Sequence, residues 1–349
     1  MEVTILGAGA MGSALSVPLS DNGHAVTLWG SRFDEDILAS LRNGEKHPRL
    51  GVQLPQSVTL TGPDELELAV EGCEVLILGV SSQGVVPVTR RIASFVDDDM
   101  TIVSIAKGIV DIESDPYMIG EGIRSVLDEK TDANPPIVCV GGPSIASEVA
   151  ERSRTAVAYA GRNENALNLV TGAMETDYYS IKSTTDLAGL QVCIGYKNAY
   201  SIALAWPDGI TERKGKNTPS SMTNLKAILF LQTIDELQTL TRALNGSVET
   251  VNGLAGLGDL VTTSSGGRNG SFGRLIGSGM SPDDALEELE QRGVGVVEGH
   301  ETADLGLDRV RTMVEESSLA LDDLPLLQEI NRVLYEDKPV TEAIEAIRF

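Results

Sequence analysis

The chain has 349 residues and 42% of them are hydrophobic, so it can bury a sizeable core, and its length favours two domains. Its formal net charge of −24 argues against a nucleic-acid partner and against attraction to an anionic membrane surface. We find neither a signal peptide nor an apolar run of membrane-spanning length, so we expect a cytoplasmic protein that is not membrane-embedded. Cys73, Cys139 and Cys193 lie far apart among apolar neighbours, which indicates buried thiols rather than disulfides or a metal site.

The first dozen residues predict a strand, a tight turn and the start of a helix. Residues 3–6 are typical of a buried strand, and Gly7, Gly9 and Gly12 then complete the pattern G-x-G-x-x-G. Glycines at this spacing permit the turn, the approach of the backbone to a pyrophosphate, and close packing of the helix on the strand. Free N–H groups at the start of the helix would hold the anion. The pattern therefore predicts a dinucleotide-binding domain.

The end of the second predicted strand, residues 27–29, bears on the choice of cofactor. NAD-binding domains usually carry an acidic residue there, which binds the ribose 2′-hydroxyl group. This chain has Ser31 and Arg32 instead, while Asp34 comes slightly too late. A hydroxyl and a guanidinium suit a 2′-phosphate, although Arg32 could equally be a solvated residue at a helix start. We therefore predict NADP or NAD, with NADP favoured.

Further apolar runs predict the rest of a parallel sheet with helices on both faces, because such strands read as continuous hydrophobic segments. They cover residues 74–80, 101–105, 137–140, 156–159 and 178–181. Polar or small residues follow the carboxyl ends of several strands, where doubly wound sheets bind ligands. They cover residues 81–83, 106–108 and 141–144. The fold class predicted for residues 1–186 is therefore α/β, a Rossmann-like doubly wound sheet.

From residue 187 to residue 349 the strand pattern gives way to helical periodicity, which predicts an all-helical second domain that binds the substrate and carries the catalytic residue. One long apolar helix near residues 190–205 carries Lys197 in its interior. Residues 251–277 are rich in glycine and hydroxyl groups between helices, which indicates a functional segment threading the cleft between the domains.

The candidate proton donors are lysines rather than histidines. His24, His47 and His300 have no partner pattern for nucleophilic catalysis or metal binding, so we expect them at the surface. Lys107 follows a strand and Lys197 lies in an apolar helix, and a buried lysine without a purpose is costly. If both face one cleft, repulsion and desolvation would lower the pKa of one towards that of a general acid or base, and the other would be a fixed cation.

Residues 266–269 predict a site for an anion. They offer glycine N–H groups, the guanidinium of Arg268 and the amide of Asn269. Asp259 precedes them and could either pair with a lysine or accept a substrate hydroxyl. Together these residues predict a small phosphorylated ketone or alcohol as the substrate of a nicotinamide-dependent oxidoreductase.

Short motifs along nearly the whole chain carry a resemblance to a known family. They are Gly7-Ala-Gly-Ala-Met-Gly12, Ala106-Lys-Gly108, Gly142-Pro-Ser144, Lys197-Asn198, Gly253-Leu-Ala-Gly-Leu-Gly-Asp-Leu260, Gly267-Arg-Asn269 and Val297-Glu-Gly299. In order and spacing they resemble NAD(P)-dependent glycerol-3-phosphate dehydrogenases, most closely the archaeal members. The resemblance implies a Rossmann-like domain followed by a helical one, a homodimer, and reversible reduction of dihydroxyacetone phosphate to sn-glycerol 3-phosphate.

The resemblance also implies residue roles. Lys197 would be the general acid and base, with Lys107 and Asp259 beside it as catalytic residues. The implied substrate contacts are Lys107, Gly142, Ser144, Asn198, Asp259, Thr263, Gly267, Arg268 and Asn269. The cofactor contacts that the resemblance implies are Ala10, Met11, Lys107, Ala146 and Glu298. They add to those predicted above from the glycine pattern and the end of the second strand, which are Gly7, Gly9, Gly12 and Arg32.

The sequence departs from the family pattern at residues 80–82, and again at residues 217–221 and 225–226. Two alternatives therefore remain. One is a related reductase of another small keto acid or phosphorylated ketone, against which residues 267–269 argue because keto acids lack the phosphate. The other is a catalytically silent NAD(P)-binding regulator, against which the retention of both Lys107 and Lys197 argues.

Overall fold

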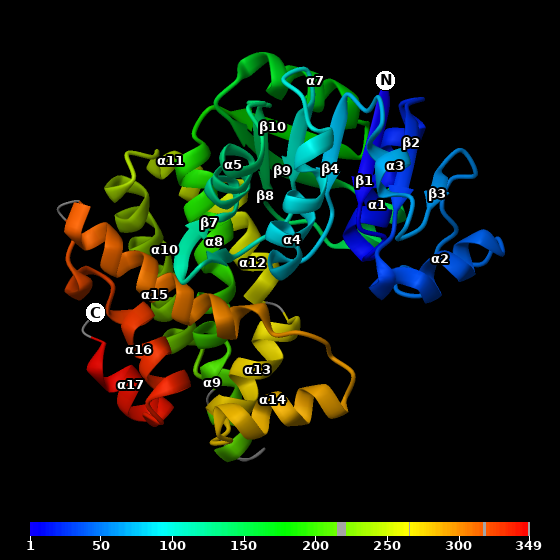
Figure 1. Ribbon diagram of the computed structural model, residues 1–349. Helices are drawn as coiled ribbons and strands as arrows, with labels where there is room; N and C mark the ends of the chain where they lie inside the picture. The colour runs from blue at the N-terminus through cyan, green and yellow to red at the C-terminus, as the bar shows by residue number, and fades with distance from the viewer. Residues whose placement is uncertain (215–220, 265, 317–318, 348–349) are drawn as a thin grey trace.

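The computed structural model describes residues 1–214, 221–264, 266–316 and 319–347. Figure 1 shows a sheet flanked by helices that carries the N-terminus, beside a bundle of helices that carries the C-terminus. The departure from the family pattern at residues 217–221 falls almost wholly outside the described residues. No helix within the described ranges is long and apolar enough to cross a membrane.

The large sheet has eight strands in the order β10-β9-β8-β5-β4-β1-β2-β3. They are β1 (Glu2–Leu6), β2 (Ala25–Trp29), β3 (Thr59–Thr61), β4 (Val75–Leu78), β5 (Thr101–Ser104), β8 (Ile137–Gly141), β9 (Thr155–Gly161) and β10 (Tyr179–Thr184). Neighbouring strands run parallel except β8 and β9, which are antiparallel, so β9 and β10 run against the other strands. The predicted strands are confirmed, whereas this reversal was not predicted.

Helices cover both faces of the sheet, which explains why β4 and β5 are buried along their whole length. One face packs against α1 (Ala10–Asp21), α6 (Ala146–Ala150) and α7 (Glu164–Met174). The other packs against α3 (Leu66–Val70), α4 (Ser82–Ile92) and α5 (Ile119–Lys130). The other helical elements of this part are η1 (Arg32–Asp34), α2 (Glu35–Arg42) and η2 (Ala93–Phe95).

A separate hairpin, β6 (Ile109–Ile112) with β7 (Asp115–Met118), was not predicted. Its two-residue turn places Glu113 and Ser114 at φ angles of 56° and 70°. Hairpin turns of this kind favour glycine or asparagine, so Glu-Ser carries no recognisable turn signal. The turn is therefore held by the pairing of its strands rather than by local preference.

The glycine-rich turn joins β1 to α1 at a close approach of three backbone segments. Gly7 has φ +120°, and a Cβ built on it would lie 2.6 Å from the carbonyl oxygen of Gly79 after β4. A Cβ on Gly12 would lie 2.2 Å from the carbonyl oxygen of Gly7. Both positions therefore exclude any side chain, and α1 starts directly against the strand.

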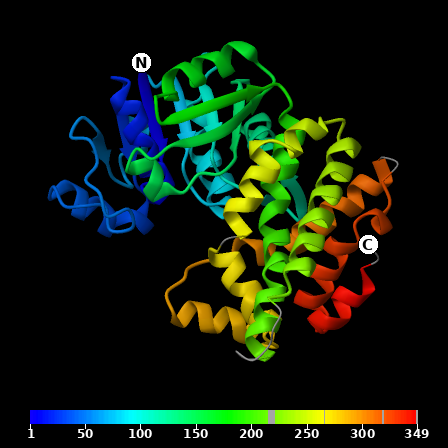
Figure 2. The same cartoon turned by 180° about the vertical axis from the view of Figure 1, so that it is seen from behind.

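The second part of the chain is helical and is built around α8 (Leu187–Leu204), in which every residue from Gly189 to Leu204 is buried. The elements that follow are α9 (Trp206–Lys214), α10 (Thr223–Ala243), α11 (Val248–Val251), η3 (Leu254–Gly258), α12 (Asp259–Ser264), α13 (Arg268–Gly277), α14 (Pro282–Gln291), α15 (Glu298–Glu316), η4 (Leu321–Asp323), α16 (Pro325–Tyr335) and α17 (Val340–Ala346). Helices α10, α13, α15 and α16 surround α8, which also packs on β8 (Figure 2). The described residues among 251–277 are mostly helical, with a π-helical turn at η3.

Candidate active site

A cavity of about 650 Å³ lies between the carboxyl edge of the sheet and the helical part. Residues following β4, β5 and β8 line one side, and α8, α12, α13 and the start of α15 line the other. Its basic side chains are those of Lys107, Lys197 and Arg268, and its acidic ones are those of Asp259 and Glu298. The cavity is thus locally cationic in a chain of net charge −24, as an anionic substrate requires.

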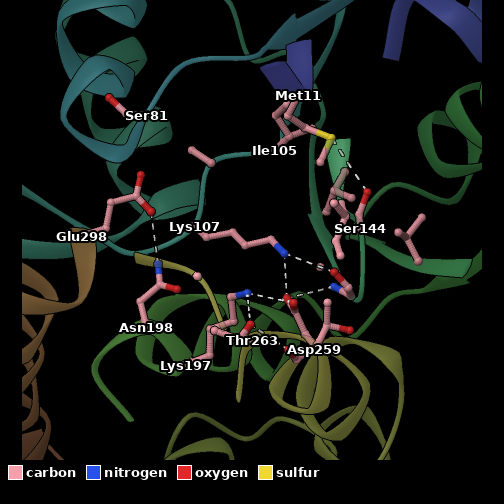
Figure 3. A pocket seen from close by; sticks show the side chains of 18 of the residues that line it. Met11, Ser81, Ile105, Lys107, Ser144, Lys197, Asn198, Asp259, Thr263 and Glu298 are labelled. Atoms are coloured by element: carbon pink, nitrogen blue, oxygen red, sulfur yellow. Dashed lines mark hydrogen bonds and ion pairs between the residues drawn. The ribbon is translucent and has the colours of Figure 1, made fainter. Parts of the chain in front are cut away.

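Both candidate lysines bind the same carboxylate (Figure 3). Lys197 Nζ lies 2.8 Å from Asp259 Oδ1, and Lys107 Nζ lies 2.7 Å from Asp259 Oδ2. Lys107 also donates a hydrogen bond to the carbonyl oxygen of Gly142 at 3.1 Å. The side chains of Lys197 and Asp259 are only 7% and 3% exposed, whereas that of Lys107 is 21% exposed. The structure therefore brings together all three residues predicted to be catalytic.

The environment of this cluster sets the protonation of its members. Burial, followed by the positive charge of Lys107, lowers the pKa of Lys197 from 10.5 to about 8, against the opposing pull of Asp259. Burial alone would raise the pKa of Asp259. The ammonium groups of Lys107 and Lys197 together lower it by more than burial raises it, so the pKa of Asp259 lies below its ordinary value. Near neutral pH the cluster thus contains an ionised carboxylate and a lysine that can readily lose its proton.

Thr263 and Asn198 complete the surroundings of the lysine. The hydroxyl of Thr263 donates to the carbonyl oxygen of Asp259 at 2.8 Å and accepts a hydrogen bond from Lys197 Nζ at 3.1 Å. Asn198, one residue along α8, donates from Nδ2 to Glu298 Oε2 at 3.3 Å. Contacts from α12 and α15 therefore hold the reactive face of α8.

The predicted anion site lies at the start of α13. Gly266 and Gly267 both have positive φ angles, and Arg268 is the first residue of the helix. The guanidinium of Arg268 is half-exposed and lies 3.8 Å from Glu298 Oε1. Asn269 is buried and accepts the Gly299 N–H with its Oδ1 at 2.9 Å, so its Nδ2 is the group left to face a ligand. Free backbone N–H groups, a guanidinium and an amide donor therefore converge where a phosphate would lie.

The other end of the cavity reaches the start of α1. Met11 and Leu15 of α1 line it, and the hydroxyl of Ser144 lies 3.8 Å from the sulfur of Met11. A Cβ built on Gly9 would meet no heavy atom within 4 Å, so the turn faces open space at the N-terminus of α1. That opening and the free N–H groups of the first helical turn suit a pyrophosphate.

Several predicted cofactor residues lie beyond the cavity wall. Gly7, Gly9, Ala10 and Gly12 form the turn at its edge, and Ala146 begins α6 without lining the cavity. Arg32 lies in η1, and its side chain is 81% exposed with Asp64 3.9 Å away. The turn and Arg32 together mark where the adenosine half of the cofactor would extend.

The end of β2 is followed by Gly30 and Ser31 rather than by an acidic residue. A Cβ built on Gly30 would lie 2.7 Å from Leu38 Cδ1 of α2, so a side chain there would require Leu38 to shift. Asp34, the nearest acidic residue in the sequence, turns back on Ser31. Its Oδ2 accepts the Ser31 N–H at 2.9 Å and the Ser31 hydroxyl at 2.8 Å.

The structure corrects one expectation and adds residues that the sequence did not indicate. The prediction of a surface position is wrong for His47, which is fully buried, because the loop after α2 folds back against the glycine-rich turn. Thr262 and Tyr179 line the cavity without having been predicted to do so. Tyr179 belongs to an apolar strand run, so its pattern indicates only a core residue, whereas Thr262 could have been found from its position beside Thr263.

Comparisons with known proteins agree with this geometry. Models of the NAD-dependent glycerol-3-phosphate dehydrogenase N-terminus and C-terminus match residues 2–167 and 186–345. The chain is 44% identical to the NADP(+)-dependent glycerol-3-phosphate dehydrogenase of Archaeoglobus fulgidus, over 99% of this chain and 98% of that one. It is 32% identical to the NAD(P)+ enzyme of Agathobacter rectalis, over 99% and 95%.

The crystal structure of glycerol-3-phosphate dehydrogenase from Coxiella burnetii has the same fold, with a TM-score of 0.81 at 25% identity over 99% of this chain and 97% of that one. Family models match both the sheet and the helical part, and the relatives match over the full length. The chain therefore belongs to the family of NAD-dependent glycerol-3-phosphate dehydrogenases, which are oxidoreductases that use NAD or NADP.

Proposed function

We propose that this protein reversibly reduces dihydroxyacetone phosphate to sn-glycerol 3-phosphate with NADPH or NADH, and that Lys197 is its general acid and base. The observation that supports this most directly is the shared carboxylate of Asp259. This carboxylate holds both lysines in the cavity, with the Nζ atoms of Lys197 and Lys107 at 2.8 and 2.7 Å from its two oxygens. The relatives named above are glycerol-3-phosphate dehydrogenases, which supports the substrate.

In this mechanism the chain supplies the proton and the electrostatic stabilisation. The nicotinamide supplies the hydride when it is bound. As negative charge develops on the C2 oxygen of the ketone, the ammonium of Lys197 donates its proton to that oxygen, and Lys107 stabilises the charge. A pKa of about 8 lets Lys197 give up this proton readily. In the reverse direction the neutral amine of Lys197 takes the hydroxyl proton.

The phosphate of the substrate would lie against the start of α13. Arg268 would bind it through its guanidinium, and the N–H groups of Gly267 and the first turn would add hydrogen bonds. Arg268 is within 3.8 Å of Glu298 in this structure, so binding the phosphate would replace one anion by another. Asn269, Asn198, Gly142, Ser144 and Thr263 would surround the rest of the substrate.

We further propose that NADPH is the preferred cofactor. Gly30 provides no carboxylate at the end of β2, and Asp34 is engaged by Ser31. Arg32 is exposed beside that position, where its guanidinium would bind a 2′-phosphate. Arg32→Ala should therefore raise the Kd of NADPH about tenfold and leave that of NADH unchanged, in a fluorescence titration of each. An equal loss for both cofactors would contradict this role of Arg32.

The experiment that tests the reaction is oxidation of NADPH and NADH with dihydroxyacetone phosphate, for the wild-type protein and matched variants. Lys197→Ala should lower kcat at least ~1,000-fold, because it removes the group proposed to donate the proton. Lys182→Ala is the control, since this lysine is exposed on β10, away from the cavity. Arg268→Ala should mainly raise KM. Turnover of Lys197→Ala at the wild-type rate would remove the general-acid assignment.

Activity on a ketone without phosphate, equal to that on dihydroxyacetone phosphate, would instead favour the related keto-acid reductases. In that case Arg268→Ala would leave KM unchanged. A folded wild-type protein that binds NADPH but turns over no ketone would favour the silent regulator. We also propose that the protein is cytoplasmic, that it forms a homodimer, and that its two domains divide at residue 186. Light scattering would test the homodimer.

A further inference from the structure

The carbonyl oxygen of Ala8, inside the glycine-rich turn, accepts hydrogen bonds from two buried side chains. Nε2 of His47 lies 3.2 Å from it, and the hydroxyl of Ser13 lies 3.1 Å from it. Both side chains have zero exposure. His47 belongs to the loop after α2, and Ser13 to the first turns of α1, so donors from two separate segments occupy both lone pairs of one carbonyl oxygen.

The other contacts of His47 determine which ring nitrogen carries the proton. Its Nδ1 accepts the backbone N–H of Arg49 at 3.1 Å and that of Leu50 at 3.3 Å, so Nδ1 must carry a lone pair. Nε2 is then the N–H that donates to Ala8. The loop is closed by its own backbone bonds, from His47 N–H to Val52 O and from Gly51 N–H to His47 O. The imidazole therefore connects a closed loop to the turn.

Fixing the Ala8 carbonyl also fixes the next N–H group. In a trans peptide the C=O and the N–H of the following residue point in opposite directions, and no cis peptide occurs among the described residues. The carbonyl of Ala8 points inward to His47 and Ser13, so the N–H of Gly9 points outward. The space beside Gly9 is open, as the absence of any heavy atom within 4 Å of a Cβ built there indicates.

We propose that His47 and Ser13 are positioning residues of the cofactor site, which hold the Ala8 carbonyl so that the Gly9 N–H faces the pyrophosphate of NADP or NAD. The inference rests on the proposed placement of the cofactor over this turn. Without the clamp, the peptide between Ala8 and Gly9 can rotate, and the cofactor loses a hydrogen bond to its anionic group. Neither side chain touches the cofactor itself.

Two substitutions of His47 separate its two hydrogen-bonding functions. His47→Asn places an acceptor near the position of Nδ1 and removes the donor to Ala8. His47→Gln places a donor near the position of Nε2 and removes the acceptor for Arg49 and Leu50. Ser13→Ala removes the second donor. Ser16→Ala is the matched control, because Ser16 is equally buried on α1 but donates to the Ser13 carbonyl oxygen instead.

The measurement is the Kd of NADPH, by fluorescence titration, with thermal unfolding of each variant in parallel. We expect His47→Asn and Ser13→Ala each to raise Kd about fivefold to tenfold, with KM for dihydroxyacetone phosphate unchanged at saturating NADPH. His47→Gln should restore most of the affinity although it destabilises the loop, and Ser16→Ala should bind within about twofold of wild type.

Two results would overturn the proposal. One is wild-type affinity in both His47→Asn and Ser13→Ala. The other is a rise in Kd that follows the loss of thermal stability across all four variants, because that pattern indicates a purely structural role. A wild-type protein that binds neither NADPH nor NADH would instead overturn the proposed function itself, so the two failures are distinguishable.

Discussion

Two buried carboxylates touch the same helix and behave oppositely. Asp259 is 2% exposed and binds Lys197 of α8, whereas Glu236 of α10 is 1% exposed and accepts the hydroxyl of Tyr200, one turn further along α8, at 2.8 Å. The pKa of Asp259 is lowered, because two ammonium groups outweigh its burial. The pKa of Glu236 is raised to about 7, because burial outweighs its neutral hydrogen-bond donors.

The donors of Glu236 show what it does. Besides Tyr200 and Gln232, it accepts the backbone N–H groups of Leu326 at 2.6 Å and Leu327 at 3.0 Å, at the start of α16. It thus caps α16 and ties its own helix, α10, to α8, and it does not line the cavity. Cationic partners make a buried carboxylate part of a reactive cluster, whereas neutral donors make it part of the scaffold.

The largest test of this contrast exchanges the charge at each site. Asp259→Asn should lower kcat about 100-fold or more, because Lys197 loses its counter-ion and its pKa falls further beside Lys107. Glu236→Gln should keep kcat within about threefold and lower the free energy of unfolding by about 1–3 kcal/mol, because one capped N–H loses its acceptor. Steady-state kinetics and urea unfolding measure the two effects. A loss of kcat in Glu236→Gln as large as that in Asp259→Asn would end the distinction.

The pH dependence of Glu236 gives the next largest effect. Its carboxyl ionises near pH 4.5 when exposed and near pH 7 in the folded protein. Between these values the unfolded chain gains charge while the folded one stays protonated, so stability should fall as pH rises from about 4.5 to 7. The shift corresponds to about 3 kcal/mol. Urea unfolding over this range should show the decrease in wild type, and the same decrease in Glu236→Gln would assign it elsewhere.

The pH dependence of catalysis should instead follow Lys197. Only its protonated form can donate, so reduction of dihydroxyacetone phosphate should slow above pH 8, by up to about tenfold per unit. Oxidation of glycerol 3-phosphate needs the neutral amine and should slow below that value. The test is to measure the rates of reduction and of oxidation at pH values below and above 8. Two profiles with the same slope would contradict proton transfer by this residue.

The smallest expected effects come from two tyrosines on α8. Tyr200→Phe removes a donor from Glu236 and should cost about 1 kcal/mol of stability, while extending the pH-dependent decrease above pH 7. Tyr196→Phe is the control, because its hydroxyl donates at 3.2 Å to the neutral carbonyl of Gly306. It should cost a similar amount with no change in the pH dependence. If stability depended on pH identically in both variants, Tyr200 would have no influence on the titration of Glu236.

Local sequence patterns predicted the parts of the fold that depend on neighbours along the chain. The turn from Gly7 to Gly12 has one steric solution, since a Cβ at either glycine would meet backbone. The strand β4 is a continuous apolar run, and such runs indicate burial on both faces. The reversal of β9 and the β6–β7 hairpin escaped prediction, because pairing direction depends on contacts that no local pattern records.

By itself the sequence determined the residue types of the proposed site: a glycine-rich turn after the first strand, two lysines in apolar settings, and a Gly-Arg-Asn segment. Only the tertiary structure decided which of these residues contact one another. Asp259 is 152 residues from Lys107 and 62 from Lys197 along the chain, yet one carboxylate holds both lysines. It also decided that burial of Lys197 lowers its pKa and that His47 reaches the Ala8 carbonyl. Burial and charge at a site are sums over residues from many segments, and folding alone brings those segments together.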